Sequence, residues 1–261
     1  MTEQRPVPGT IDVTRPNVAR MYDYYLGGKD NFAVDRQAAE RVLAAAPHTP
    51  ALARQNRAFL ERAVRYLGER GVGQFLDIGA GLPTRRNVHE VVRDAVPGGR
   101  VVYVDNDPVV LSHGRALLDG AVDAGYVAGD VRRPADLLAE AGLDLSRPVG
   151  LLLLAVLHCV PDEEDPWAAV RELRDALAPG SHLVLSHITD AELSASARAG
   201  ADVYRKASST MTLRDRDAIT RFFDGFTVVE PGVVPLPDWR PTEAVREDLP
   251  TWFLCGVGRK D

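Results

Sequence analysis

The 261-residue sequence lacks the features that mark membrane, secreted and nucleic-acid-binding proteins. It has no apolar run of the roughly 20 residues that a membrane-spanning helix needs, and the opening residues MTEQRPVPGTIDVTRP contain no apolar segment of a signal peptide. Its formal net charge of −6 opposes general binding to phosphate backbones, which needs clustered Lys and Arg. These absences predict a cytoplasmic protein with no membrane or nucleic-acid partner. The oligomeric state is not readable from the sequence.

Cysteine is also scarce. Only Cys159 and Cys255 are present, and both lie in apolar segments. Two such residues indicate neither a disulfide framework nor a metal site, so we predict two buried thiols and no metal. The hydrophobic content of 45% is ordinary for a globular α/β protein.

From residue 74 onward, short apolar runs alternate with helical patterns such as 163–178 and 213–224. Seven runs are predicted strands: 74–79, 100–106, 123–130, 149–157, 181–189, 226–232 and 252–259. This alternation is typical of a doubly wound, mostly parallel, Rossmann-like α/β sheet. The last two runs have no long helix between them, so we expect the last strand to be antiparallel.

The first 70 residues follow a different pattern. Residues 1–16 contain four Pro or Gly residues and are predicted to be a loosely held arm. Apolar residues then recur at helical spacing around 18–26, 35–46 and 52–71. We therefore predict an arm and helical cap over residues 1–70 and a sheet core over residues 71–261.

Three predicted strand ends carry groups suited to a ligand, which in an open α/β sheet binds at the carboxyl ends of the strands. The segment FLDIGAGLPT brings Asp77 and then the turn Gly79-Ala80-Gly81, where no large side chain obstructs a ligand. In VVYVDND, Asp105 is placed to accept hydrogen bonds from ribose hydroxyls.

The third strand end is YVAGDVRRP. Here Asp130 is placed to accept from an exocyclic amine, and Val131 to lie against a purine. A dinucleotide fingerprint would have a third glycine where Thr84 stands, and Asp77 suits an ammonium group better than a phosphate. The pattern therefore favours S-adenosylmethionine. An NAD-dependent oxidoreductase, and a protein that binds S-adenosylmethionine without methyl transfer, remain as alternatives.

Three longer segments, RPNVARMYDYYLGGKDNFAVDR, FLDIGAGLPTRRNVHEVV and VVYVDNDPVVLSHGRALL, together resemble a bacterial family of S-adenosyl methyltransferases once catalogued as a domain of unknown function. The resemblance covers almost the whole chain and implies a class I, S-adenosylmethionine-dependent methyltransferase. It also implies cofactor contacts: to the methionine portion from Gly79, Ala80 and Gly81 with Asp77 behind them, to the ribose from Asp105 and Asn106, and to the adenine from Asp130 and Val131.

The segment YDYYLGGKDNF, residues 22–32, supplies a further expectation. Aromatic faces beside a sulfonium are favourable, so Tyr24, Tyr25 and Asn31 are predicted to line a lid over the cofactor, with a bend at Gly27-Gly28. The alternative is that the tyrosines only pack the helices onto the sheet.

Two histidines follow buried strands and are candidates for a general base. His158 and His187 are suited to take a proton from a hydroxyl or amine near neutral pH, although histidines in such places also serve as packing residues. The predicted acceptor is a small molecule whose identity the sequence does not disclose. Its expected neighbour is the segment 190–212, in which Tyr204 and Met211 are candidate lining residues.

Overall fold

Eight strands form one sheet in the described part of the computed structural model, which covers residues 12–84, 86–190, 195–204, 207, 211–241 and 250–261. They are β1 (Gln74–Ile78), β2 (Arg100–Asp105), β3 (Ala124–Ala128), β4 (Val149–Leu154), β5 (His182–Ile188), β6 (Thr227–Val228), β7 (Val234–Pro235) and β8 (Phe253–Arg259). Their order is β3-β2-β1-β4-β5-β8-β6, with β7 also paired to β8. The strand order reverses between β1 and β4, the place where such sheets bind ligands.

The strand directions confirm the predicted sheet. Strands β1 to β5 pair in parallel, and β8 runs antiparallel to β5. The short strands β6 and β7 both pair antiparallel with β8. Strand β7 was not predicted, and β6 keeps only two residues of the predicted run 226–232. That run contains Pro231, which has no N–H for a strand ladder.

Helices cover both faces of the sheet. They are α3 (Thr49–Gly68), α4 (Val88–Ala95), α5 (Pro108–Leu117), α6 (Pro134–Ala141), α7 (Pro166–Ala176) and α9 (Arg216–Thr220), with short 3-10 turns η1 (Leu157–Cys159), η2 (Asp162–Glu164), η4 (Arg221–Phe223) and η5 (Leu236–Asp238). Successive strand residues point to opposite faces. Phe75 therefore packs with Phe59 of α3, whereas Leu76 belongs to the core that includes Leu173 of α7 and Phe222.

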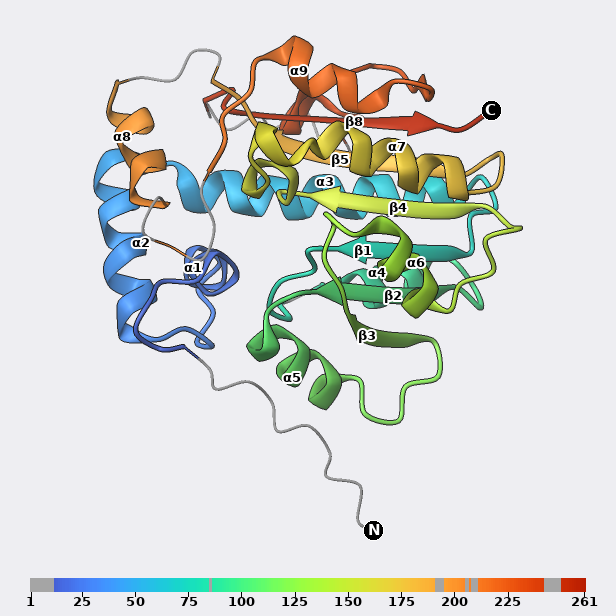
Figure 1. Cartoon of the computed structure of the whole chain (residues 1–261), viewed down its shortest axis with the longest axis horizontal. Coiled ribbons are helices and arrows are strands. Elements are labelled where there is room, and N and C mark those ends of the chain that lie inside the picture. Colours follow the sequence, from blue (N-terminus) through green and yellow to red (C-terminus); the bar gives the residue numbers. More distant parts are fainter. Residues whose placement is uncertain (1–11, 85, 191–194, 205–206, 208–210, 242–249) are drawn as a thin grey trace.

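The helices α1 (Val18–Tyr25), α2 (Ala33–Ala45) and α8 (Ala195–Val203) gather at the end of the sheet where the parallel strands finish (Figure 1). They share an apolar cluster that contains Met21, Ala39, Val42 and Tyr204. Sequence reasoning did not assign α8 to this cap, because α8 follows β5 in the chain.

The helix α3 belongs to both parts of the molecule. Ala53 near its start joins the cap cluster, while Phe59 and Leu67 lie in the core of the sheet. The division of the chain at residue 70 stays a prediction, and residues 1–11 of the predicted arm lie outside the described residues. Within the part of the chain that the structure describes, no helix is both long and apolar enough to cross a bilayer.

Candidate active site

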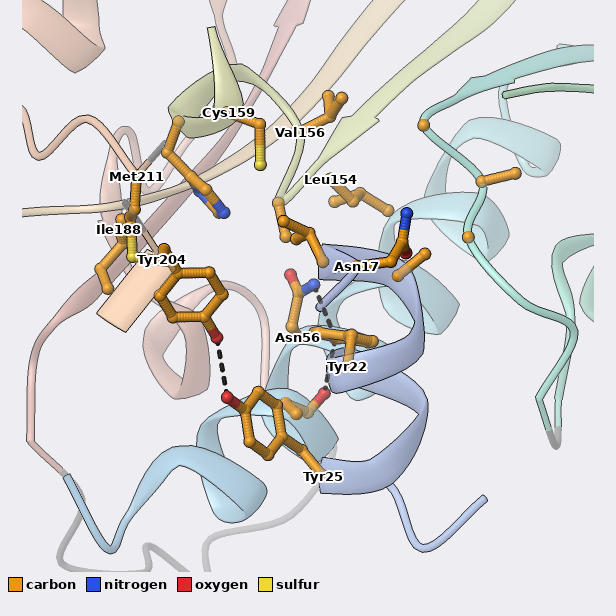
Figure 2. Close-up of a pocket in the computed structure, with 18 of the residues that line it drawn as sticks. Asn17, Tyr22, Tyr25, Asn56, Leu154, Val156, Cys159, Ile188, Tyr204 and Met211 are labelled. Carbon is orange, nitrogen blue, oxygen red and sulfur yellow. Dashed lines mark hydrogen bonds between the residues drawn. The ribbon is translucent and has the colours of Figure 1, made fainter. Parts of the chain in front are cut away.

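A cavity of about 580 Å³ lies between the carboxyl ends of the parallel strands and the cap helices. Figure 2 shows that helix α1 borders it with Asn17, Tyr22 and Tyr25, and that Tyr204 and Met211 face it from the other side. The predicted strand-end residues Asp77, Gly79, Ala80, Gly81, Asp105, Asn106, Asp130 and Val131 all line this one cavity.

The turn after β1 depends on its glycines. Gly79 and Gly81 have φ of 71° and 67°, in the left-handed region that side chains disfavour. A Cβ on Gly79 would also lie 2.4 Å from a methyl carbon of Val156, so this residue admits no side chain. The N–H groups of Gly79 and Ala80 donate to the carbonyl of Val104, at 2.9 and 3.1 Å. The turn is thereby held against β2 with its backbone toward the cavity.

The carboxylate of Asp105 joins this turn to the start of α5. One oxygen accepts from the N–H of Gly81 and the other from the N–H of Asp107, each at 2.9 Å. Burial raises the pKa of Asp105, and these two hydrogen bonds oppose the shift. Each carboxylate oxygen accepts more than one hydrogen bond, so Asp105 keeps acceptor capacity toward the cavity.

Asp77 is buried, and none of the described residues donates a hydrogen bond to its carboxylate. Burial raises its pKa to about 7; the charge of Arg57 opposes this shift, and that of Asp105 adds to it. Arg57, from α3, also lines the cavity, and its buried Nε has no partner in the described structure. Its Nη2 donates to the carbonyl of Arg86 at 2.7 Å. A carboxyl and a guanidinium thus both retain unused hydrogen-bonding atoms beside the glycine turn.

The end of β3 is held by an internal ion pair. Arg132 donates to Asp130 from its backbone N–H, its Nε and its Nη2, at 3.0, 2.8 and 2.5 Å. The hydrogen bond from the Arg132 side chain lowers the pKa of Asp130, so this carboxyl is ionised at neutral pH. Asn106 donates to the same carboxylate at 3.4 Å, and Val131 beside it is buried.

A family profile described as S-adenosyl methyltransferase matches residues 4–261. The chain belongs to this family. The cofactor of this methyltransferase is therefore S-adenosylmethionine, as the glycine turn and the strand-end acids predicted. Among curated proteins, none matches the chain.

Solved structures agree with this assignment. A candidate methyltransferase from Thermobifida fusca YX has 39% identity and a TM-score of 0.88, covering 98% of this chain and 99% of that chain. A DUF574 family protein from Streptomyces avermitilis MA-4680 has 37% identity and a TM-score of 0.90, covering 96% and 99%. The mitomycin 7-O-methyltransferase MmcR has a TM-score of 0.52 at 17% identity, over 92% of this chain and 71% of that chain, and shows the fold alone.

The cap of the methyltransferase differs from the predicted lid at two residues. Tyr25 lines the cavity, but Tyr24 does not, and its hydroxyl donates to Glu40 of α2 instead. Asn31 also lies outside the lining, because its amide donates to Asp23 at 2.8 Å and to the carbonyl of Gly28 at 3.1 Å. Tyr22, on the same helix, lines the cavity together with Tyr25.

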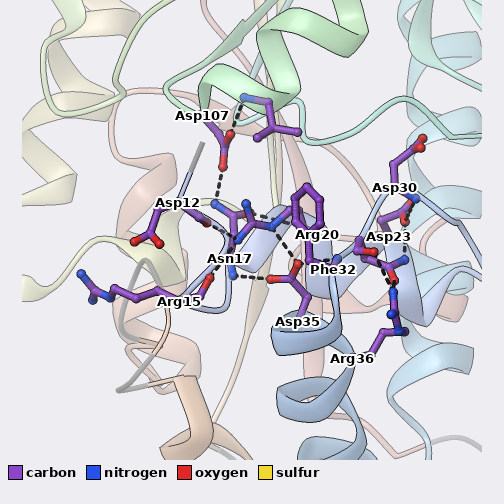
Figure 3. A network of polar contacts seen from close by, with 12 residues as sticks. Asp12, Arg15, Asn17, Arg20, Asp23, Asp30, Phe32, Asp35, Arg36 and Asp107 are labelled. Carbon is purple, nitrogen blue, oxygen red and sulfur yellow. Dashed lines mark hydrogen bonds and ion pairs between the residues drawn. The ribbon is translucent and has the colours of Figure 1, made fainter. Parts of the chain in front are cut away.

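A buried polar network determines which face of α1 points toward the cavity (Figure 3). Asp35 pairs with Arg20 at 2.8 Å and accepts from the backbone N–H groups of Asn17 and Phe32, both at 2.8 Å. The side chain of Asn17 donates to Asp107, which follows β2. The cap is thus tied directly to the strand end that carries Asp105.

The two candidate histidines have different surroundings. His158 lines the cavity, whereas His187 is fully buried beneath it and does not. Burial lowers the pKa of His158 to about 3, helped by the charge of Arg214. Burial also lowers the pKa of His187 well below its ordinary value. Both imidazoles are therefore neutral and only weakly basic at physiological pH. A role for either of them as a general base stays a prediction.

Sequence reasoning missed Asn56 of α3. Its amide donates to the hydroxyl of Tyr22 at 3.1 Å, and its carbonyl oxygen accepts from Ser186 at 2.7 Å, so it links the cap to β5. A signal was present: Asn56 lies on the apolar stripe of its helix, four residues after Leu52 and four before Leu60, where a polar residue is unusual. Of the two predicted buried thiols, Cys255 is buried, but Cys159 is half-buried and lines the cavity.

Proposed function

We propose that this protein transfers a methyl group from S-adenosylmethionine to a small-molecule acceptor bound in the same cavity. The observation that carries the proposal is the convergence of three strand ends on one side of the cavity and of the cap tyrosines on another. Strands β1, β2 and β3 bring the turn at Gly81, Asp105 and Asp130. A single cavity thus combines a site for an adenosyl amino acid with a second, largely apolar region.

The residues present fit the cofactor. The carboxylate of Asp105 has acceptor capacity for ribose hydroxyls, and Val131 with Asp130 offers an apolar surface and an acceptor for adenine. Asp77 and Arg57 have unused acceptors and donors beside the glycine turn. We assign Asp77 to the ammonium and Arg57 to the carboxylate of the cofactor's amino acid portion.

When bound, the cofactor supplies an electrophilic methyl group on a sulfonium. The protein's own residues position the two ligands and limit the access of water. Positioning and exclusion of water are the two effects that most accelerate a displacement of this kind. The cap helices cover the cavity. Helix α1 is held in place by the hydrogen bond from Asn17 to Asp107 and by the ion pair of Arg20 with Asp35. The hydrogen-bonded chain from Ser186 through Asn56 to Tyr22 then anchors the cap to β5.

The test is isothermal titration calorimetry with S-adenosylmethionine, S-adenosylhomocysteine and NAD. Binding of both adenosyl ligands and none of NAD supports the proposal, and Asp105→Ala should weaken that binding at least tenfold. If neither adenosyl ligand binds, the assignment of this cavity as the cofactor site is overturned. If both bind but no acceptor class yields a methylated product, the protein uses its cofactor for regulation and the methyl-transfer proposal fails.

A further inference from the structure

We infer that the acceptor is an uncharged, ring-containing apolar molecule, methylated on a phenolic or enolic hydroxyl that the hydroxyl pair of Tyr25 and Tyr204 holds. This inference rests on the proposed function, because it identifies the acceptor of that reaction. Both tyrosines line the cavity, one at the end of α1 and the other directly after α8. Figure 2 shows the two hydroxyls directed at each other across the cavity wall.

The region around this pair is apolar. We call it the acceptor half of the cavity. It is lined by α2, the start of α3, α8, the end of β5, the start of β8 and the segment before α9, with side chains such as Val42, Leu52, Ile188, Met211 and Phe253. The described residues of this half include no charged side chain.

The charged side chains of the cavity lie elsewhere. They come from α1, α3 and the ends of β1, β2 and β3, on the cofactor's side: Asp23, Arg57, Asp77, Asp105, Asp107, Asp130 and Arg132. A buried carboxylate or ammonium without a partner is strongly disfavoured. Because none of the described residues of the acceptor half could pair with such a charge, we expect an acceptor that is uncharged when it binds there.

The two hydroxyls leave one proton for a ligand. Their oxygens lie 2.8 Å apart, so one hydroxyl donates to the other. The second O–H then has no acceptor among the described residues, although both side chains are buried. Buried hydroxyls normally find a partner. An oxygen of the acceptor molecule would complete the pair.

The pair acts as a donor and not as a base. Burial raises the pKa of Tyr25 and of Tyr204 well above that of an ordinary tyrosine, so both stay protonated at neutral pH. His187 has no lone pair to offer, and His158 has a pKa of about 3. The acceptor hydroxyl must therefore lose its proton without a strong base, which a phenol or an enol does far more readily than an alcohol, since a phenol has a pKa of about 10.

Methyl transfer would begin with the loss of the acceptor's hydroxyl proton. The hydroxyl proton leaves to solvent through the open side of the cavity. The donated hydrogen bond, and the positive charge that the cofactor would supply, would stabilise the resulting oxyanion. An oxygen lone pair then forms the bond to the methyl carbon as the carbon–sulfur bond breaks. The products are a methyl ether and S-adenosylhomocysteine.

The experiment uses protein saturated with S-adenosylhomocysteine and four matched probes: 1-naphthol, naphthalene, 1-naphthoate and 1-naphthylmethylammonium. Equilibrium dialysis should show 1-naphthol binding about tenfold tighter than naphthalene, with the two charged probes weaker still. In Tyr25→Phe/Tyr204→Phe the affinity for 1-naphthol should fall to that for naphthalene. The matched control is Tyr24→Phe on the same helix, whose hydroxyl contacts Glu40 outside the cavity and whose loss should change neither affinity.

The outcomes separate the two proposals. If the wild-type protein fails to bind S-adenosylhomocysteine, the proposed function fails. If it binds this ligand, but 1-naphthol binds no tighter than naphthalene or than either charged probe, the acceptor inference alone is overturned. Unchanged affinity of the double variant for S-adenosylhomocysteine shows that it has folded, so retention of tight 1-naphthol binding in that variant would also overturn the inference.

Discussion

Nη1 of Arg214 lies 2.7 Å from Nε2 of His187, and this contact places the imidazole proton on Nδ1. A guanidinium only donates, so Nε2 accepts. Nδ1 then donates to the carbonyl of Ile188 at 2.6 Å. Arg214 is itself buried and also donates to the carbonyls of Leu157 and Val160. His187 is thus a link between β5 and the loop after β4, with both nitrogens occupied.

The first prediction concerns the stability that Arg214 supplies. Arg214→Met should lower the free energy of unfolding by about 3 kcal/mol, because buried carbonyls and Nε2 of His187 lose their donor. Urea denaturation measures the change. The control is Arg133→Met, whose side chain is 76% exposed and forms an ion pair with Asp136, and which should change stability by less than about 0.5 kcal/mol. Equal losses in the two variants would contradict the structural role of Arg214.

The second prediction concerns His158. Its pKa is lowered to about 3 in the folded protein, so between pH 6.5 and 3 the unfolded chain binds a proton that the folded chain does not. Stability from this residue is therefore present above pH 6.5 and lost as the pH falls. Relative to His158→Gln, the wild-type protein should lose up to about 1.4 kcal/mol per pH unit below 6.5. A constant difference between the two proteins from pH 7 to 4.5 would contradict this burial.

The third prediction concerns Asp77. Its pKa of about 7 means that the ligand-free protein is largely protonated there at pH 6, whereas the ammonium of the cofactor requires the ionised form. Binding below pH 7 should release a proton, and affinity for S-adenosylhomocysteine should rise about tenfold per pH unit from 5 to 7 and then level off. In Asp77→Asn, affinity should be lower and independent of pH over this range. Calorimetry at several pH values measures both affinities. If affinity depends on pH in the same way in the wild-type protein and in Asp77→Asn, Asp77 does not bind the ammonium.

The fourth prediction concerns Arg57, whose buried Nε has no partner in the described structure. If its guanidinium holds the cofactor's carboxylate, Arg57→Gln should weaken binding of S-adenosylhomocysteine about 10- to 100-fold, the range expected for a hydrogen bond to a charged group. Binding of 5′-methylthioadenosine, which has no amino acid portion, should not change. A similar loss for both ligands would show that Arg57 only supports the shape of the cavity.

The strand ends were predictable because their chemistry is local. In a parallel sheet the carboxyl ends of neighbouring strands meet at one edge, so Asp77, Gly81, Asp105 and Asp130 could be brought together from strand positions alone. The structure places all four along one cavity. Their roles toward the cofactor remain proposals that the binding experiments test.

The choice among the tyrosines was not predictable in the same way. Consecutive residues on a helix point about 100° apart, and only tertiary contacts decide which face is covered. The buried pairing of Arg20 with Asp35 and the bond from Asn17 to Asp107 rotate α1 so that Tyr22 and Tyr25 face the cavity, leaving Tyr24 beside α2.

The sequence by itself determined the sheet, its cofactor edge and the family, since strand periodicity, glycine turns and adjacent acids involve residues close together in the chain. Only the tertiary structure decided the acceptor half. Tyr204 lies 179 residues from Tyr25, and Arg214 lies 27 residues from the His187 whose lone pair it occupies. Such contacts depend on how distant helices and strands pack, and short-range patterns carry no information about that packing.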